Sequence, residues 1–279
     1  MGWHTTDRVD DFVANAGDFL RRRPVENTVP LTLAATLQAR GPYAFGPDRP
    51  VYGWWTTTAG EVQGAFLQTP PHPLLLTSAP PDAVPALAGA LVDRPLPGVN
   101  ARSADAETFA ATWRQRTGGT ARTGRRTRLY RLATLTVPDP PPGRARVAGA
   151  ADRAVLIDWY RAFHADIGEP ARGGPDLVDD KLEYGGLTLW EVDGEPVAMA
   201  GVSRTDAGMV RVAAVYTPPD RRGRGYGGAV TAAVSRAALD GGATDVVLFT
   251  DLANPTSNAL YQRLGYRPVE DRTVMEFTA

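Results

Sequence analysis

Hydrophobic and polar residues follow two periodicities along this chain, and each predicts one kind of element. Apolar side chains recur every three or four residues in the segments expected to be helical, which are 7–20, 84–92, 106–113, 152–164, a stretch ending at 239, and 255–264. Shorter apolar or alternating runs predict strands at 51–57, 62–68, 73–78, near 99, 128–137, 187–192, 196–204, 209–216, 244–250 and 266–277. The pattern therefore predicts an α+β fold.

The two halves of the chain show the same order of predicted elements. A Pro-Pro-Asp turn occurs at 80–82 and again at 218–220, and a Gly-Glu hairpin turn occurs at 60–61 and again at 194–195. Each hairpin turn follows a strand that contains tryptophan. These recurrences in register predict a tandem duplication of one α+β unit.

A proline-rich segment separates the two halves. Residues 138–143 read Pro-Asp-Pro-Pro-Pro-Gly, and consecutive prolines favour extended backbone without internal hydrogen bonds. We therefore expect a linker at this point, with one domain over residues 1–143 and another over residues 144–279.

Composition excludes several classes of function. The chain has 30 Lys+Arg and 31 Asp+Glu residues, so its balanced charge argues against binding nucleic acid through a basic excess. It has no cysteine and 3 histidines, which excludes thiolate chemistry and makes a metal site unexpected. No signal peptide or membrane-spanning run is recognisable. We expect a cytoplasmic protein with no membrane partner.

One segment concentrates residues that suit an anion. An apolar strand ending at Tyr216 runs into a loop of arginine and glycine that leads directly into a helix. The residues of this loop and of the helix start are Arg221, Arg222, Gly223, Arg224, Gly225, Tyr226, Gly227 and Gly228. Glycine lets backbone N–H groups approach an anion closely, and a helix N-terminus favours negative charge. The segment therefore predicts a pyrophosphate cradle.

Two other interpretations of this loop are possible. Gly223, Gly225 and Gly228 satisfy the dinucleotide pattern G-x-G-x-x-G, and Asp251 falls about where a ribose-binding acid would be. That pattern requires glycine at the strand end, whereas a turn and two arginines intervene here. The loop could also be a purely structural glycine-rich turn.

The loop and a second motif together resemble the GNAT superfamily of acyl-coenzyme A-dependent N-acyltransferases. The family motif Q/R-x-x-G-x-G/A is matched by residues 222–227, and the family segment N-x(6)-Y-x(3)-G-F/Y is matched by residues 254–266. The resemblance covers residues 145–279 and extends to the first half only through the order of elements. It implies two tandem GNAT-like units, each a mixed, mostly antiparallel sheet flanked by helices.

The resemblance also implies how acetyl-CoA would bind. Two parallel strands, ending at Tyr216 and Thr250, would part to admit the pantetheine arm, and the backbone N–H of Tyr216 would stabilise the oxyanion. The coenzyme-binding residues implied are Val215, Tyr216, Thr217, Arg222, Gly223, Arg224, Gly225, Tyr226, Gly227, Gly228, Asn254 and Tyr261. Because cysteine is absent, we expect direct transfer of the acetyl group to an amine of a small molecule or peptide while both substrates are bound.

The catalytic assignments leave alternatives open. Tyr261 would protonate the departing thiolate, but it could instead be a packed core tyrosine. Asn254 could serve only as a helix cap. The general base would be Glu191, Asp251 or Glu169, acting directly or through water.

The first half departs from the family motif where the coenzyme loop should be. After Ser78 the sequence has no arginine and no paired glycines, and Pro85 removes an N–H that a phosphate would need. We expect no coenzyme in this half, which would buttress the second half or shape its acceptor cleft. The alternative function for the whole chain is a non-catalytic acyl-CoA sensor or interaction module.

Overall fold

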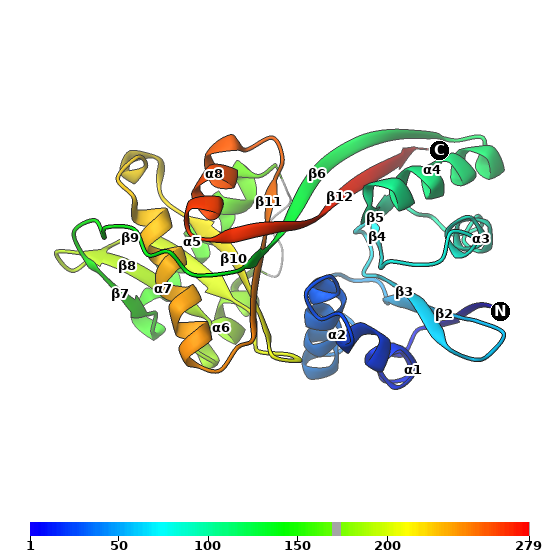
Figure 1. Cartoon of the computed structure of the whole chain (residues 1–279), viewed down its shortest axis with the longest axis horizontal. Coiled ribbons are helices and arrows are strands. Elements are labelled where there is room, and N and C mark those ends of the chain that lie inside the picture. The colour runs from blue at the N-terminus through cyan, green and yellow to red at the C-terminus, as the bar shows by residue number, and fades with distance from the viewer. Residues whose placement is uncertain (169–173, 279) are drawn as a thin grey trace. The chain divides into compact units, whose positions relative to one another are not determined.

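The computed structural model describes residues 1–168 and 174–278, which form two compact units. The first unit consists of Met1–Leu129, Asp251–Ala253 and Val269–Ala279, and the second consists of Tyr130–Thr250 and Asn254–Pro268. Figure 1 shows the elements of each unit. No helix among the described residues is long and apolar enough to cross a membrane.

The first unit is a mixed sheet with helices on both faces. Its strand order is β1-β2-β3-β4-β5-β12-β6, where β4 and β5 are parallel and β12 runs antiparallel to β5. The strands are β1 (Gly2–Thr6), β2 (Val51–Thr56), β3 (Val62–Gln68), β4 (Leu74–Leu76), β5 (Gly98–Arg102), β6 (Thr120–Leu132) and β12 (Tyr266–Thr278). The helices are α1 (Val9–Arg21), α2 (Thr28–Arg40), α3 (Ala83–Ala90) and α4 (Ser103–Thr117).

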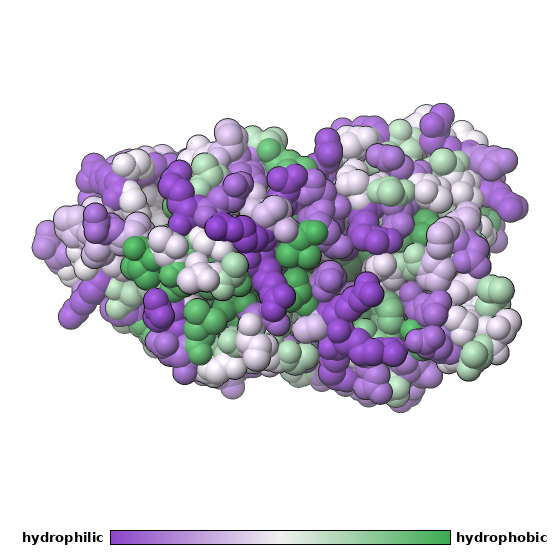
Figure 2. Space-filling model, in the orientation of Figure 1, coloured by the Kyte–Doolittle hydropathy of each residue, from purple (hydrophilic) through white to green (hydrophobic). Residues whose placement is uncertain are grey.

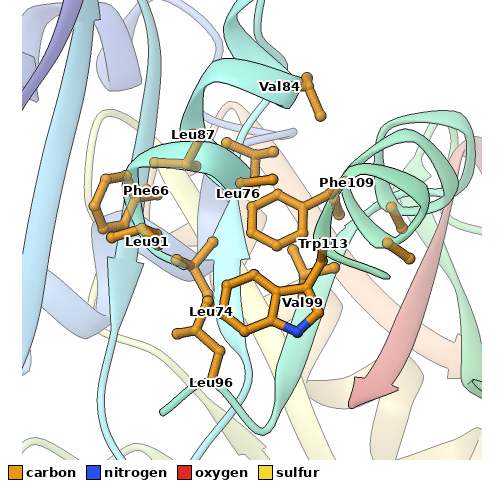
Figure 3. Close-up of a cluster of buried hydrophobic side chains, with 14 of the residues drawn as sticks. Phe66, Leu74, Leu76, Val84, Leu87, Leu91, Leu96, Val99, Phe109 and Trp113 are labelled. Carbon is orange, nitrogen blue, oxygen red and sulfur yellow. The ribbon is translucent and has the colours of Figure 1, made fainter. Parts of the chain in front are cut away.

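Alternation along the central strands divides the core of this unit into two layers. Leu74 and Leu76 of β4 pack with α3 and α4, whereas Leu75 between them packs with α1 and α2. Successive side chains of a strand point to opposite faces, so a run of three leucines fills both layers. Figure 3 shows the first layer, in which Phe109 and Trp113 of α4 lie against the leucines of β4.

The second unit repeats this architecture. Its strand order is β6-β11-β10-β9-β8-β7, and β10 and β11 are its parallel pair. The further strands are β7 (Arg144–Val147), β8 (Leu187–Val192), β9 (Glu195–Val202), β10 (Met209–Tyr216) and β11 (Asp245–Asp251). The helices are α5 (Arg153–Asp166), α6 (Gly174–Glu183), α7 (Tyr226–Asp240) and α8 (Pro255–Arg263), with short 3-10 turns η1 (Ala150–Asp152) and η2 (Pro219–Arg221). This architecture confirms the predicted α+β class.

The division of the chain differs from the one predicted at residue 143. Residues 120–129 of β6 and 269–278 of β12 belong to the first unit, and the remainder of each strand belongs to the second. The first unit therefore takes the strand beside β5 from the C-terminal end of the chain. Sequence order alone gives no signal for this arrangement, because strand neighbours are decided by pairing and not by proximity along the chain.

The proline-rich segment packs on the second unit and is not a free linker. Trp190 Nε1 donates to the Pro142 carbonyl at 3.0 Å. A side chain at Gly143, where φ is +113°, would collide with the Glu191 carbonyl, so only glycine fits this close approach. The segment and α7 border an apolar slot of about 300 Å³, and Figure 2 shows apolar surface gathered over α7.

The C-terminal strand should govern the stability of the first unit. Phe277 of β12 is 9% exposed and stacks on Trp113 with ring centroids 5.3 Å apart. Because truncating a buried aromatic ring leaves a cavity, we expect Phe277→Ala to lower the free energy of unfolding by about 3–5 kcal/mol. Urea unfolding followed by tryptophan fluorescence measures this loss.

Val269→Ala is the matched control, since Val269 lies on the same strand and is 39% exposed. Val269→Ala should change the free energy of unfolding by less than about 0.5 kcal/mol. Equal effects of the two substitutions would show that β12 is not part of the core of the first unit.

Candidate functional site

The parallel strands β10 and β11 stop pairing before either strand ends. Their register runs from Met209 opposite Asp245 to Val212 opposite Leu248, although β10 continues to Tyr216 and β11 to Asp251. Beyond Val212, the backbone groups of β10 on the side of β11 no longer pair with β11. Backbone groups of this kind need another hydrogen-bond partner. These are the two strands that the resemblance implied would part.

A bulge redirects β10 just before its end. The pairing of β10 with β9 shifts register between Ala213 and Tyr216, and Ala214 has a φ of +50°. Left-handed backbone is uncommon outside glycine, and in proteins it often marks a functional site. The bulge changes the direction of the backbone at Val215 and Tyr216. Sequence reasoning missed it because alanine gives no signal for this conformation.

Two glycines determine the path of the loop between β10 and α7. Gly223 and Gly225 have φ values of +77° and +83°, which residues with a Cβ adopt only at a cost. Gly225 is the N-cap of α7, and no side chain caps this helix. The N–H groups of the first turn, starting at Tyr226, are therefore left for another acceptor. Together with the helix dipole they form a site suited to an anion.

Of the next two glycines, Gly228 serves close packing and Gly227 has room for a Cβ. A Cβ on Gly228 would lie 3.0 Å from Leu260 Cδ1, and one on Gly227 would lie 3.5 Å from Thr217 Oγ1. Gly228 thus lets α7 approach α8. The structure gives this glycine a packing role in addition to any part its N–H takes in binding.

The arginines of the loop are exposed and bonded locally. Arg222 donates from Nε to the Thr217 carbonyl at 2.9 Å and forms an ion pair with Asp166 at the end of α5. Arg224 reaches the Asp220 carbonyl at 3.4 Å. Exposed pairs of this kind contribute little energy and rearrange readily. These guanidinium groups can therefore turn toward an anion bound at the start of α7.

Asn254 acts as a helix cap. Its Oδ1 accepts from the Ser257 backbone N–H at 3.0 Å, and Pro255 follows as the first residue of α8. This is the structural role that sequence reasoning kept as an alternative. The side chain is exposed, so capping does not prevent a further contact with a ligand.

Tyr261 lies on α8 in the core of the second unit. It is 8% exposed and meets the Tyr266 ring edge-on with centroids 6.1 Å apart. Its hydroxyl has no hydrogen-bond partner among the residues that the structure describes. Burial raises the pKa of Tyr261 to about 12, so the hydroxyl stays protonated at neutral pH and can donate a proton.

The candidate bases are engaged elsewhere. Glu191 pairs with Arg146 and with Arg144, and the hydrogen bond from Arg146 holds its pKa below the usual range. Asp251 pairs with Arg125 at 3.1 Å and belongs to the first unit. Glu169 lies outside the described residues. Glu191 thus belongs to the same unit as Tyr261 but is paired with two arginines, whereas Asp251 belongs to the other unit.

Aromatic side chains of α5 lie beside the end of β10. Trp159 and Tyr216 have ring centroids 6.0 Å apart, and the guanidinium of Arg222 is 5.9 Å from the Tyr216 ring. The sequence analysis assigned no functional role to Trp159. Its contact with Tyr216 could not be read from helical spacing, because it depends on how α5 packs on the sheet.

The first unit closes the corresponding position with an arginine. β4 and β5 pair over Leu74 with Val99 and Leu75 with Asn100. Arg272 of β12, 5% exposed, donates from Nη2 to the carbonyls of Leu76 at 2.8 Å and Asn100 at 3.1 Å. One guanidinium thus bonds to both parallel strands where their pairing ends.

A family model matches part of the chain. Residues 154–266 match the family described as Acetyltransferase (GNAT) family. No curated protein matches the chain. No group of three or more potential metal ligands occurs within residues 1–168 and 174–278.

Solved structures match nearly the whole chain at low identity. An acetyltransferase of the GNAT family from Colwellia psychrerythraea is 14% identical, with 100% of both chains covered and a TM-score of 0.64. A GCN5-related N-acetyltransferase from Sphaerobacter thermophilus is 17% identical, covering 99% of this chain and 95% of its own, with a TM-score of 0.64. A tandem GNAT protein from the clavulanic acid biosynthesis pathway is 12% identical, covering 99% and 98%, with a TM-score of 0.59. These likenesses confirm the tandem fold.

Removing the guanidinium of Arg272 should destabilise the first unit. In Arg272→Met the buried carbonyls of Leu76 and Asn100 lose a donor, and Glu270 loses the ion pair it makes at 2.9 Å. We expect the free energy of unfolding to fall by about 2–5 kcal/mol. Arg116→Met, an exposed arginine of α4, is the control and should change it by less than about 0.5 kcal/mol. Matching urea midpoints would contradict the structural role of Arg272.

Proposed function

We propose, on the premise that residues 154–266 match the family described as Acetyltransferase (GNAT) family, that the protein transfers an acetyl group from acetyl-CoA to an amine. The observation that carries the proposal is the start of α7. There, left-handed Gly223 and Gly225 leave the helix without a side-chain cap, and the parallel strands beside it stop pairing at Val212. A pyrophosphate group fits the first feature, and an extended pantetheine arm fits the second.

Each part of the coenzyme has expected partners in the second unit. The N–H groups from Arg222 to Gly228 would hold the pyrophosphate, with Arg222 and Arg224 adding positive charge. Backbone groups of Val215 and Thr217 would pair with the pantetheine arm as a further strand does. Further contacts would come from Tyr216, Asn254 and Tyr261.

The reaction we propose is direct transfer in a ternary complex. The amine nitrogen forms a bond to the thioester carbonyl carbon, and the carbonyl oxygen gains charge that the Tyr216 N–H would stabilise. The carbon–sulfur bond then breaks, the amide forms, and Tyr261 gives its proton to the departing thiolate. Bulk water returns a proton to Tyr261.

A general base must remove the ammonium proton of the amine. Glu191 is a poor direct base because the Arg146 hydrogen bond lowers its pKa. Asp251 accepts from the Ala253 N–H at 2.8 Å and pairs with Arg125, so it would act through water. The assignment of the base to Glu191, Asp251 or Glu169 stays a prediction.

The proposal places coenzyme in the second unit alone, and calorimetry tests this. We expect one acetyl-CoA site per chain. Gly225→Asp should weaken binding at least about tenfold, since its carboxylate would repel the pyrophosphate. The matched control is Gly60→Asp, because Gly60 has nearly the same φ, +80°, but lies in a hairpin turn of the first unit. Two sites per chain, or unchanged affinity in Gly225→Asp, would refute the assignment.

Tyr261→Phe tests the acid and separates an enzyme from a sensor. The assay measures thiol release from acetyl-CoA with a panel of amines. We expect the substitution to lower kcat by a factor of about 10² to 10⁴, with little change in coenzyme affinity. Because the pKa of Tyr261 is raised to about 12, its ionisation should not reduce wild-type kcat between about pH 6 and 10.

Tyr266→Phe is the control for loss of a buried tyrosine hydroxyl, since Ser235 keeps its second bond to the Thr231 carbonyl. It should leave kcat nearly unchanged. A Tyr261→Phe rate within about threefold of wild type would rule out the acid role. Coenzyme binding without thiol release for any amine would favour the sensor over the enzyme.

A further inference from the structure

The first unit contains an open cleft of about 610 Å³. It is bordered by the turn between α1 and α2, the start of β3, the segment after β4 and the end of β5. Its volume lies within the range of small-molecule sites in proteins, about 300–1,000 Å³. The cleft belongs to the unit for which we propose no coenzyme, so it is separate from the acetyl-transfer site.

Charges of both signs line this cleft. Arg22, Arg23, Glu26 and Glu61 all border it. Arg22 and Glu61 are 3.7 Å apart, more than half exposed, and so weakly paired. Within the described part of the chain, neither Arg23 nor Glu26 has a charged partner. Both a guanidinium and a carboxylate are therefore available to a ligand.

Apolar and polar residues share the remaining border, and the polar ones are Asn27, Gln63, Ser78, Arg102 and Glu270. Its apolar part includes Phe19, Val62, Ala79 and Pro80, and Val62 opens the strand β3. An apolar wall next to unpaired charges of both signs suits a ligand with an apolar body and two charged ends. A ligand with a single charge could pair with only one of the two protein groups, whereas a zwitterion could pair with both.

We propose that this cleft binds a small zwitterion of the amino-acid or short-peptide type. The ammonium of the ligand would lie against Glu26, its carboxylate against Arg23, and its side chain against the apolar wall. Arg272 bonds to both β4 and β5 where their pairing ends, so a pantetheine arm has no place there. The cleft is therefore a binding site and not a second site of transfer.

A dipeptide with two blocked derivatives tests the ligand chemistry. The probes are alanyl-phenylalanine, its N-acetyl derivative without an ammonium, and its C-terminal amide without a carboxylate, each titrated into the full chain by calorimetry. We expect the free dipeptide to bind at least about tenfold more tightly than either derivative. Free phenylalanine, titrated in parallel, distinguishes an amino acid from a peptide as the preferred ligand. Absence of binding by both free zwitterions, or equal binding of the dipeptide and its two derivatives, would overturn the proposal.

Two substitutions locate the site. Glu26→Gln should abolish the preference for the dipeptide over its N-acetyl derivative, and Arg23→Met should abolish the preference over the amide. The controls Glu107→Gln and Arg116→Met, exposed residues of α4, should keep both preferences. Loss of a preference in either control, or retention of both preferences in Glu26→Gln and Arg23→Met, would overturn the proposal.

Measurements of acetyl-CoA binding distinguish failure of this proposal from failure of the acetyl-transfer proposal. Gly225→Asp should keep dipeptide binding although its affinity for acetyl-CoA is lowered, because the two sites lie in different units. Competition between acetyl-CoA and the dipeptide at the site defined by Glu26 would overturn the zwitterion site. Failure of coenzyme binding alone would leave the dipeptide titration unaffected.

Discussion

Backbone groups at the end of a parallel strand pair need hydrogen-bond partners once the strands stop pairing, and both units are built around this constraint. In the first unit the buried guanidinium of Arg272 supplies a donor to β4 and β5 together. In the second unit β10 and β11 stop pairing at Val212 and Leu248, and there we propose the pantetheine arm. The end of the parallel strand pair is thus closed by an arginine side chain in the first unit and suited to a ligand in the second.

The start of α7 also has backbone groups that need hydrogen-bond partners. A helix leaves its first N–H groups without partners inside the helix. Asn254 caps α8 with its side chain, whereas α1 to α5 and α7 begin without a side-chain cap. Among these uncapped helices, α7 is the one preceded by left-handed Gly223 and Gly225, which let an anion approach its first N–H groups.

The stability of the first unit rests on residues that come last in the chain. β12 pairs with β5 from Arg272 opposite Arg102 to Glu276 opposite Gly98, and Phe277 packs in the aromatic group of α4. The two units therefore share the long strands β6 and β12, and the proline-rich segment near residue 143 packs within the second unit. Substitutions near residue 272 should act on the unit that contains the N-terminus.

The sequence by itself determined the α+β class, the repeated order of elements and the arginine–glycine loop, because these follow from periodicity and from residues with special backbone freedom. It missed the edge strands β1 and β7, which contain few apolar residues (Trp3 in β1, and Ala145 and Val147 in β7). It also began β6 near residue 128, where the structure begins it at Thr120. Only the tertiary structure decided that Ala214 is strained, that Glu191 is held by Arg146, and that Arg272 joins two strands. Each of these features depends on contacts between residues distant in sequence. The local sequence pattern does not predict which distant residue will make such a contact.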